Sequence, residues 1–400
     1  SDHSYAVRWK AADASDELLT FHYLQSMHNY DDYKKAISTF QTPGQNFAFA
    51  DKAGQIAIWQ QGQFPAKWKE QGLFVMPGED SSYMWQGYIP SDQNPYMVLD
   101  SGTDRGFVSS ANQEPTDTTY PYYLGSDFPI YRGLIINRNL AAMSAITPVD
   151  MMKLQTDNFD VFAQMAQPLL LGHLRDSGLN EEEKSYLNIF KLWKFRNEPD
   201  EEGPTIFYIW WNHLEHDILD DEYSRTSLPL QRPYESTILE ALLRDTSWSF
   251  IDNVNTKGKE DLTDIVTEAF HEAIPDLAQA GQNRRLTWGR FKDTWARHLL
   301  RLPALSRTHL MIGGGAHCIN AAKQSHGPSW RMIVQLTDKT EAYGIYPGGQ
   351  SGNPGSRYYD TFVDRWVAGE YLPVWVMTSN DKSDSRVKWV MHFSSSTAAD

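Results

Sequence analysis

The chain has 400 residues, of which 41% are hydrophobic and 13% aromatic, so it can form a large core and intrinsic disorder is not expected. Asp and Glu number 51 against 36 Lys and Arg, and the net charge of −15 argues against nucleic acids and anionic membranes as partners. The single cysteine, Cys318, excludes an intrachain disulfide and a cysteine-based zinc site. The sequence contains no run of eighteen apolar residues, so it predicts no membrane-spanning helix.

The first hundred residues predict short strands and two helices. Residues 5–9 alternate as a strand does, Ser15 is expected to cap a first helix, and Asn29 is expected to open a second. The apolar stripes of these helices are Leu18, Phe21 and Leu24 in the first and Tyr33, Ile37 and Phe40 in the second. Residues 47–58 then predict a hairpin, and the Gly- and Pro-rich residues 60–105 predict loops with short strands.

The stretch from residue 106 to residue 132 combines a predicted strand with a polar loop. Phe107 and Val108 predict the strand, and the loop that follows contains Asn112. An Asn side-chain N–H at the end of a strand can stabilise a developing oxyanion. The alternative interpretation is a turn Asn that bonds only to neighbouring backbone.

Helices dominate the prediction from residue 134 to residue 300. Thr147 and Asp150, with a proline between them, have the spacing of a capped helix N-terminus, and residues 187–193 and 206–214 are apolar enough to predict helices. Three acidic clusters lie in this section, at residues 181–183, 198–202 and 217–222. They lack the alternating oxygen ligands and central Gly of a calcium loop, so we interpret them as solvated helix faces.

The last hundred residues return to strands and turns. Residues 313–322 are rich in Gly but lack the Gly-Lys-Ser/Thr ending of a phosphate-binding loop. His317 and Cys318 are adjacent there, and because sequence neighbours rarely face each other we expect no Cys-His dyad. Residues 329–336 predict a half-buried strand, and residues 386–393 predict a closing strand. The alternating apolar positions of the first of these strands are Met332, Val334 and Leu336.

Several segments of the chain resemble the penicillin acylase family of N-terminal-nucleophile amide hydrolases. They are GFVSSANQEP, YPYYLGSD and the following YR within residues 106–132, TP-x-DMM-x-LQTD at residues 147–157, and PGGQSGNPGS at residues 347–356 with Tyr359, Asp360, Trp366, Gly369, Tyr371 and Pro373 after it. These segments occur in the same order as in the family. The resemblance covers nearly the whole chain.

The resemblance implies an α+β fold, specifically part of an Ntn-hydrolase αββα stacked-sheet core with a large helical insertion. The whole chain, residues 1–400, is then expected to be a single domain. Residues 1–133 would supply strands, helices, loops and the oxyanion Asn, and residues 134–300 the mainly helical section. Residues 301–400 would return to the core with strands and a Gly-rich loop.

The resemblance also implies a linear-amide hydrolase that forms an acyl-enzyme on an N-terminal Ser. Asn112 matches the Asn whose side chain supplies half of the family's oxyanion hole, and Arg132 matches the Arg behind the nucleophile. Ser1 stands first in this chain, but residues 5–9 match a strand well inside the family's β chain. We therefore expect the nucleophile, the α chain and the N-terminal part of the β chain to lie upstream, and this chain alone to be inactive.

The partners implied by the resemblance are those segments of the same precursor and a small-molecule acyl amide. No cofactor is expected for the chemistry. The family often binds a structural calcium, expected to be held mainly outside this chain, and Asp127 is the only acid in the 106–132 loop near its expected place. A periplasmic or secreted location is implied as well.

Two other classes of protein stay open from the residues alone. A carbohydrate-binding module would suit the 14 Trp and 20 Tyr, because apolar rings stack on sugars. A glycoside hydrolase with two carboxylates would pair Glu79 or Asp80 with Asp104. The placement of Trp on apolar helical faces favours core positions over a sugar-binding surface, and these residues are Trp193, Trp210, Trp295 and Trp366.

Overall fold

The computed structural model describes residues 4–100, 102, 105–125, 128–226, 230–377 and 382–393. Residues up to 100 form a layer of two helices and a small sheet. Its elements are α1 (Glu17–Leu24), α2 (Tyr30–Ile37), β1 (Gln45–Ala50), β2 (Ile56–Gln61) and β3 (Tyr96–Leu99), with 3-10 turns at Lys10–Ala12, Ser81–Tyr83 and Ser91–Gln93. The sheet is antiparallel in the order β1-β2-β3.

The starts of the first elements follow from local chemistry. Asn29 caps α2, because its side chain accepts a hydrogen bond from the Asp32 amide, as predicted. The N-cap residue of α1 is Asp16, one residue later than the predicted Ser15. The predicted hairpin is confirmed, with Phe49 opposite Ala57 in its register.

A helical body follows this layer. Its elements are α3 (Tyr131–Ala142), α4 (Pro148–Gln155), α5 (Val161–His173), α6 (Glu181–Leu192), α7 (Gly203–Tyr223), α8 (Glu235–Arg244), α9 (Leu262–Gln282) and α10 (Trp288–Lys292), with a 3-10 turn at Ser249–Ile251. Thr147 and Asp150 form a reciprocal capping box at the start of α4, as their spacing predicted. The main hydrophobic core lies between α5, α6, α7 and α9, where Phe162, Trp210 and Phe270 are completely buried.

The C-terminal part of the chain returns to sheet. Its elements are β4 (Thr294–Ala296), β5 (Arg307–Leu310), β6 (Arg331–Gln335), β7 (Glu341–Ile345), α11 (Val363–Val367) and β8 (Leu372–Val374), with a 3-10 turn at Pro303–Leu305. β4 pairs with β5, and a separate antiparallel sheet has the order β6-β7-β8. Trp193, Trp210 and Trp366 are buried, as expected of core residues. Trp295 is half-buried and lies on β4, not on a helix as predicted.

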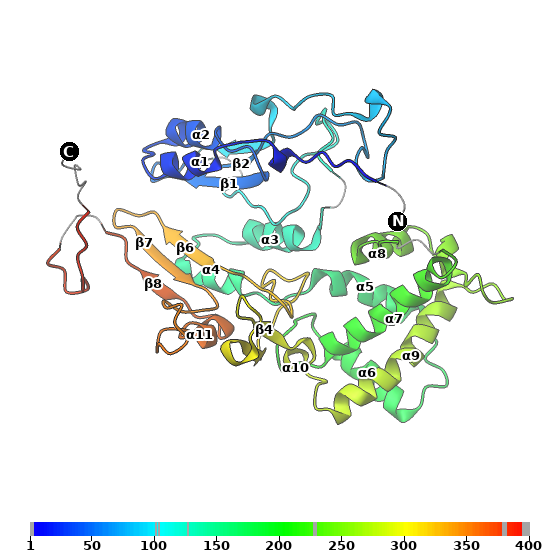
Figure 1. Ribbon diagram of the computed structural model, residues 1–400. Helices are drawn as coiled ribbons and strands as arrows, with labels where there is room; N and C mark the ends of the chain where they lie inside the picture. The colour runs from blue at the N-terminus through cyan, green and yellow to red at the C-terminus, as the bar shows by residue number, and fades with distance from the viewer. Residues whose placement is uncertain are drawn as a thin grey trace.

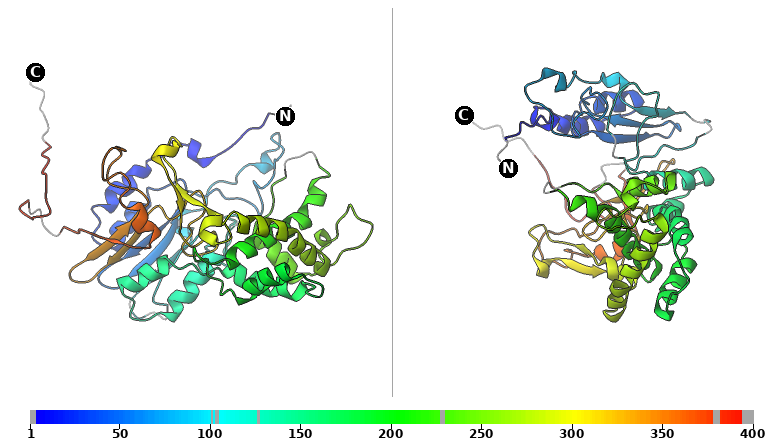
Figure 2. Two further views of the ribbon diagram at one scale, coloured as in Figure 1. Left: turned by 90° about the horizontal axis from the view of Figure 1, so that it is seen from below. Right: turned by 90° about the vertical axis from the view of Figure 1, so that its right-hand side faces the viewer.

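The N-terminal layer is stacked on the rest of the molecule. Figure 1 shows α3 beneath the first sheet, the long helices at one end and β6–β8 at the other. The right-hand view of Figure 2 shows the N-terminal layer as a distinct sheet-and-helix slab on top of the other elements. Hydrogen bonds between the layers include those from the Asn46 amide to the Ser110 hydroxyl, at 2.8 Å, and from the Lys52 ammonium to the Asp338 carbonyl, at 3.1 Å.

Three predicted strands are not formed. Residues 5–9, 107–108 and 386–393 have no regular secondary structure. A strand needs hydrogen bonds to a neighbouring strand, and these segments pair with none among the residues described by the structure. Val7 and Trp389 of the first and last segments are exposed, whereas Phe107 and Val108 are half-buried.

The second sheet has one buried and one open face. Arg331 and Ile333 of β6 are buried, whereas Met332 is 52% and Val334 44% exposed. The strand is half-buried as predicted, but its apolar alternation does not mark its buried side. The buried Arg331 is tolerated because its guanidinium donates to the Trp366 carbonyl at 2.8 Å and to the Asn320 side chain at 2.9 Å.

Candidate active site

Asn112 and Arg132, the two predicted site residues, are brought together by the fold. Arg132 lies in the first turn of α3, and its Nη2 donates a hydrogen bond of 2.7 Å to Oδ1 of Asn112. Asn112 has a φ of +65°, a left-handed conformation that Asn tolerates better than most residues. The turn interpretation of Asn112 therefore describes its backbone, while its side chain is bonded to a cation from another element.

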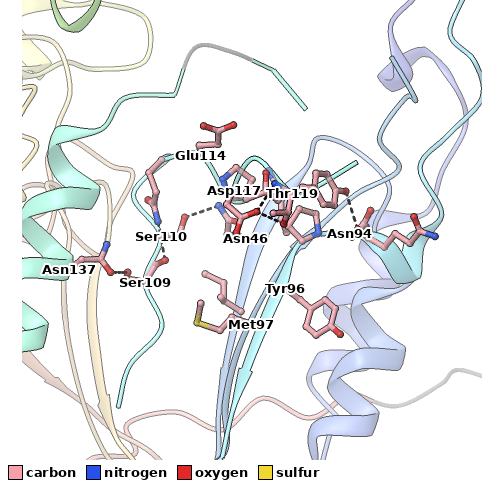
Figure 3. Close-up of a pocket in the computed structure, with 18 of the residues that line it drawn as sticks. Asn46, Asn94, Tyr96, Met97, Ser109, Ser110, Glu114, Asp117, Thr119 and Asn137 are labelled. Carbon is pink, nitrogen blue, oxygen red and sulfur yellow. Dashed lines mark hydrogen bonds between the residues drawn. The ribbon is translucent and has the colours of Figure 1, made fainter. Parts of the chain in front are cut away.

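The loop that carries Asn112 is attached to α3 by side chains. Asn137 of α3 accepts a hydrogen bond of 3.0 Å from the Ser109 hydroxyl (Figure 3). It also accepts one from the Arg105 guanidinium. The side-chain amide of Asn137 in turn donates a hydrogen bond of 2.7 Å to the Gly133 carbonyl, one helical turn earlier. These contacts replace the strand that the sequence predicted at residues 107–108.

The chemistry of the pair fixes which way the Asn112 amide faces. A guanidinium has donors and no acceptor, so the carbonyl oxygen of Asn112 must be the atom that meets Arg132. The two N–H donors of Asn112 are then directed away from Arg132. Burial lowers the pKa of the Arg132 guanidinium, but a guanidinium stays charged in proteins, so the pair keeps its polarity.

A cavity of about 870 Å³ opens beside this pair. That volume falls within the range of small-molecule sites. Its walls come from the Asn112 loop, the start of α3, the start of α8 and the Gly-rich loop before β6. Among the lining residues are Asn112, Glu114, Phe128, Ile130, Tyr131, Arg132, Tyr234, Glu235, Glu240, His317, Lys323, His326 and Trp330.

An ion pair that the sequence did not predict lies in the wall of this cavity. Nε2 of His317 is 2.6 Å from a carboxylate oxygen of Glu235, at the first position of α8. Burial lowers the pKa of His317, but the hydrogen bond to Glu235 and the charges of Asp160 and Glu235 outweigh it, and the net shift is upward. The His317 ring packs edge-on against Tyr131, the residue before Arg132. The only sequence signal for His317 was its place in a Gly-rich segment.

The Gly-rich loop folds around a buried lysine side chain. The Lys292 ammonium donates to the carbonyls of Gly313, Gly314 and Ala322 at 2.8, 3.1 and 2.8 Å. Burial lowers the pKa of Lys292 to about 7. Cys318 is fully buried, and its thiol donates to the Asn158 carbonyl at 3.2 Å. His317 instead bonds to Glu235 in the cavity wall, so the two neighbouring side chains have different partners.

A second cavity, of about 720 Å³, lies on the other side of the Asn112 loop. Figure 3 shows polar side chains from β1, the segment before β3, the loop and α3 around it, including Asn46, Asn94, Ser109, Ser110 and Asn137. Asn94 is buried and donates to the Gly62 carbonyl, but its side-chain oxygen has no partner. We call this space the amide-lined cavity. Glu114 lines both cavities, so the Asn112 loop is the partition between them.

Some predicted positions cannot be placed in either cavity. Ser1, Asp127 and Asp104 lie outside the described residues. Asp80 accepts a hydrogen bond from the Ser82 amide and so caps a 3-10 turn. Among the residues that the structure describes, no group of three His, Cys, Asp or Glu side chains is gathered to hold a metal ion, and no helix is long and apolar enough to cross a membrane.

Comparison with known proteins identifies the family. The model of the penicillin amidase family matches residues 1–383. The chain belongs to the penicillin amidase family. It is similar over 95% of its length to thermostable penicillin G acylase from Alcaligenes faecalis, with a TM-score of 0.65, 15% identity and 73% of that chain covered. The expected fold class, α+β with the Ntn-hydrolase fold, is thereby confirmed.

Curated relatives of this penicillin amidase family member are acylases. Acyl-homoserine lactone acylase QuiP from Pseudomonas putida is 25% identical over 373 residues, which is 84% of this chain and 44% of that protein. The QuiP of Pseudomonas aeruginosa is 22% identical over 380 residues, with 82% and 44% covered. Penicillin acylase 2 proenzyme from a Pseudomonas species is 28% identical over 113 residues, 28% of this chain and 14% of that protein. The chain thus spans less than half the length of these relatives.

Proposed function

We propose that this chain is the C-terminal portion of the β chain of an amidohydrolase that cleaves a linear amide through an acyl-enzyme. The observation that carries the proposal is the bond from Arg132 to Oδ1 of Asn112 at the edge of the 870 Å³ cavity. It leaves the Asn112 N–H donors to stabilise a negatively charged oxygen. Such a donor typically contributes on the order of 10²–10³ in turnover.

The nucleophile in this proposal is an N-terminal Ser upstream of residue 1, whose free α-amino group acts as base. The hydroxyl attacks the substrate carbonyl, and the amine leaves with a proton. Water then releases the acid from the ester. Asn112 stabilises the tetrahedral oxyanion in both steps, and Arg132 orients Asn112. No step depends on a metal, and the structural calcium that the family often binds would be held mainly by residues outside this chain.

The remainder of the precursor, namely the α chain and the N-terminal part of the β chain, is the partner we propose. Exposed apolar surface supports this, because soluble proteins rarely leave large contiguous apolar patches open. Leu18 of α1 is 83% exposed, and Met332 and Val334 lie on the open face of β6. The share of the QuiP relatives covered, 44%, leaves enough chain to cover such faces.

The substrate we propose is an N-acyl amide, and acyl-homoserine lactones are the first to test because relatives of that name match most of the chain. Phenylacetyl, phenoxyacetyl and glutaryl amides are the other acyl classes. A location outside the cytoplasm, periplasmic or secreted, is part of the same proposal.

The experiment compares this chain with the full precursor on fatty-acyl and phenylacetyl anilides and on acyl-homoserine lactones. The precursor is expected to hydrolyse at least one of them, and this chain alone none. Turnover by this chain alone that is lost in the Ser1→Ala variant would place the nucleophile at Ser1 and overturn the fragment proposal. A processed precursor that cleaves none of these amides would contradict the proposed activity.

A further inference from the structure

Gln113, the residue after Asn112, forms hydrogen bonds from its side-chain amide to two backbone groups of the Asn112 loop. Its Oε1 accepts a hydrogen bond of 2.6 Å from the Ala111 amide. Its Nε2 donates a hydrogen bond of 3.2 Å to the Ser109 carbonyl. The two bonds close the chain into a tight turn just before Asn112, where the backbone takes its φ of +65°.

The same side chain packs against α3 at Gly133. A Cβ atom built on Gly133 would lie 3.0 Å from Cβ of Gln113 and 3.2 Å from its Oε1, closer than ordinary van der Waals contact. Glycine at position 133 therefore lets Gln113 approach the helix. Gly133 directly follows Arg132, so this contact and the Arg132–Asn112 bond hold neighbouring points of the loop to one turn of α3.

We propose that Gln113 is a positioning residue that holds Asn112 in the geometry needed for oxyanion stabilisation, an inference that rests on the proposed function. Gln113 has no direct contact with the reacting atoms in this proposal. Without its two bonds, residues 109–111 are free to relax, and the Asn112 amide moves relative to the oxyanion. A displacement of about 1 Å can cost on the order of 10²-fold in rate.

The test uses the full precursor and the variant Gln113→Met, which keeps side-chain length but removes both hydrogen bonds. We expect kcat to fall by about 10- to 100-fold with KM nearly unchanged, because only the transition state needs the oxyanion donor. Gly133→Ala should lower kcat in the same way from the helix side. Gln93→Met is the matched control: its exposed side chain lines the amide-lined cavity. It should leave kcat unchanged.

A double variant separates positioning from general damage to the fold. If Gln113 acts through Asn112, Gln113→Met should cost nothing further in an Asn112→Gly background. An equal loss in both backgrounds overturns the inference while leaving the proposed function intact. If Asn112→Gly itself leaves kcat unchanged, the proposed function and the inference both fail.

The turn can also be followed in this chain without any turnover. Hydrogen exchange of the Ala111 amide should accelerate at least tenfold in Gln113→Met and stay unchanged in Gln93→Met, because the amide loses its acceptor only in the first variant. Unchanged protection in Gln113→Met would overturn the inference.

Discussion

Replacing Asn112 by Gly and by Ala separates what its side chain does from what its backbone requires. Both variants remove the amide donor and leave Arg132 without its acceptor. They differ in the backbone, because Asn112 has a φ of +65° and a Cβ atom in that region costs about 1–2 kcal/mol, whereas Gly carries no such cost. We therefore expect equal losses of turnover but unequal losses of stability.

The magnitudes follow from these two effects. In the full precursor, kcat should fall by about 10²–10³ in both variants, which corresponds to about 2.7–4 kcal/mol of transition-state stabilisation. In thermal or urea unfolding of this chain, Asn112→Ala should be less stable than Asn112→Gly by about 1 kcal/mol.

A third variant, Asn112→Asp, keeps an oxygen for Arg132 but has no N–H donor. It should unfold like the wild type and still lose at least as much kcat as Asn112→Gly, since a carboxylate repels an oxyanion. The reasoning is refuted if Asn112→Gly retains kcat within about threefold of wild type, a change far below that for an oxyanion donor. It is also refuted if the two variants Asn112→Gly and Asn112→Ala have equal stability.

Three other predictions concern the surroundings of the site. The pKa of His317 in the folded protein lies above its ordinary value of 6.5, so the stability that its ion pair contributes is full below pH 6.5 and is lost as pH rises through the folded pKa. Glu235→Gln should therefore lower Tm more at about pH 5.5 than at about pH 8.5. An equal loss of Tm at both pH values would contradict this prediction. Lys292→Met should reduce the free energy of unfolding by about 2–4 kcal/mol, because three buried carbonyls lose their hydrogen-bond donor. Urea unfolding measures this change, and a reduction below about 0.5 kcal/mol would contradict the prediction. The double variant Met332→Lys with Val334→Lys changes two exposed side chains on the open face of β6, so the Tm of this chain should stay within about 2 °C of the wild type. The variant should no longer co-purify with the rest of the precursor. Retained co-purification would show that the open face of β6 is not where the rest of the precursor binds.

The sequence determined the elements whose cause is local. The Asn29 cap and the capping box of Thr147 and Asp150 formed where expected, because the hydrogen bonds involved join residues three positions apart. The hairpin of β1 and β2 formed for a similar reason, since a short turn brings its strands together. The segments that carried the family resemblance also placed Asn112 and Arg132, although their roles stay predictions.

Only the tertiary structure decided features that depend on a distant partner. Residues 5–9 and 386–393 have the alternation of strands, yet a strand exists only where another strand pairs with it, and none among the described residues does. The ion pair of His317 with Glu235 joins residues 82 positions apart, which no local pattern indicates. The contact between Asn112 and Arg132 likewise needs α3 to fold back on the loop before it. Local chemistry could be predicted here, and long-range pairing could not, because pairing depends on where the rest of the chain lies.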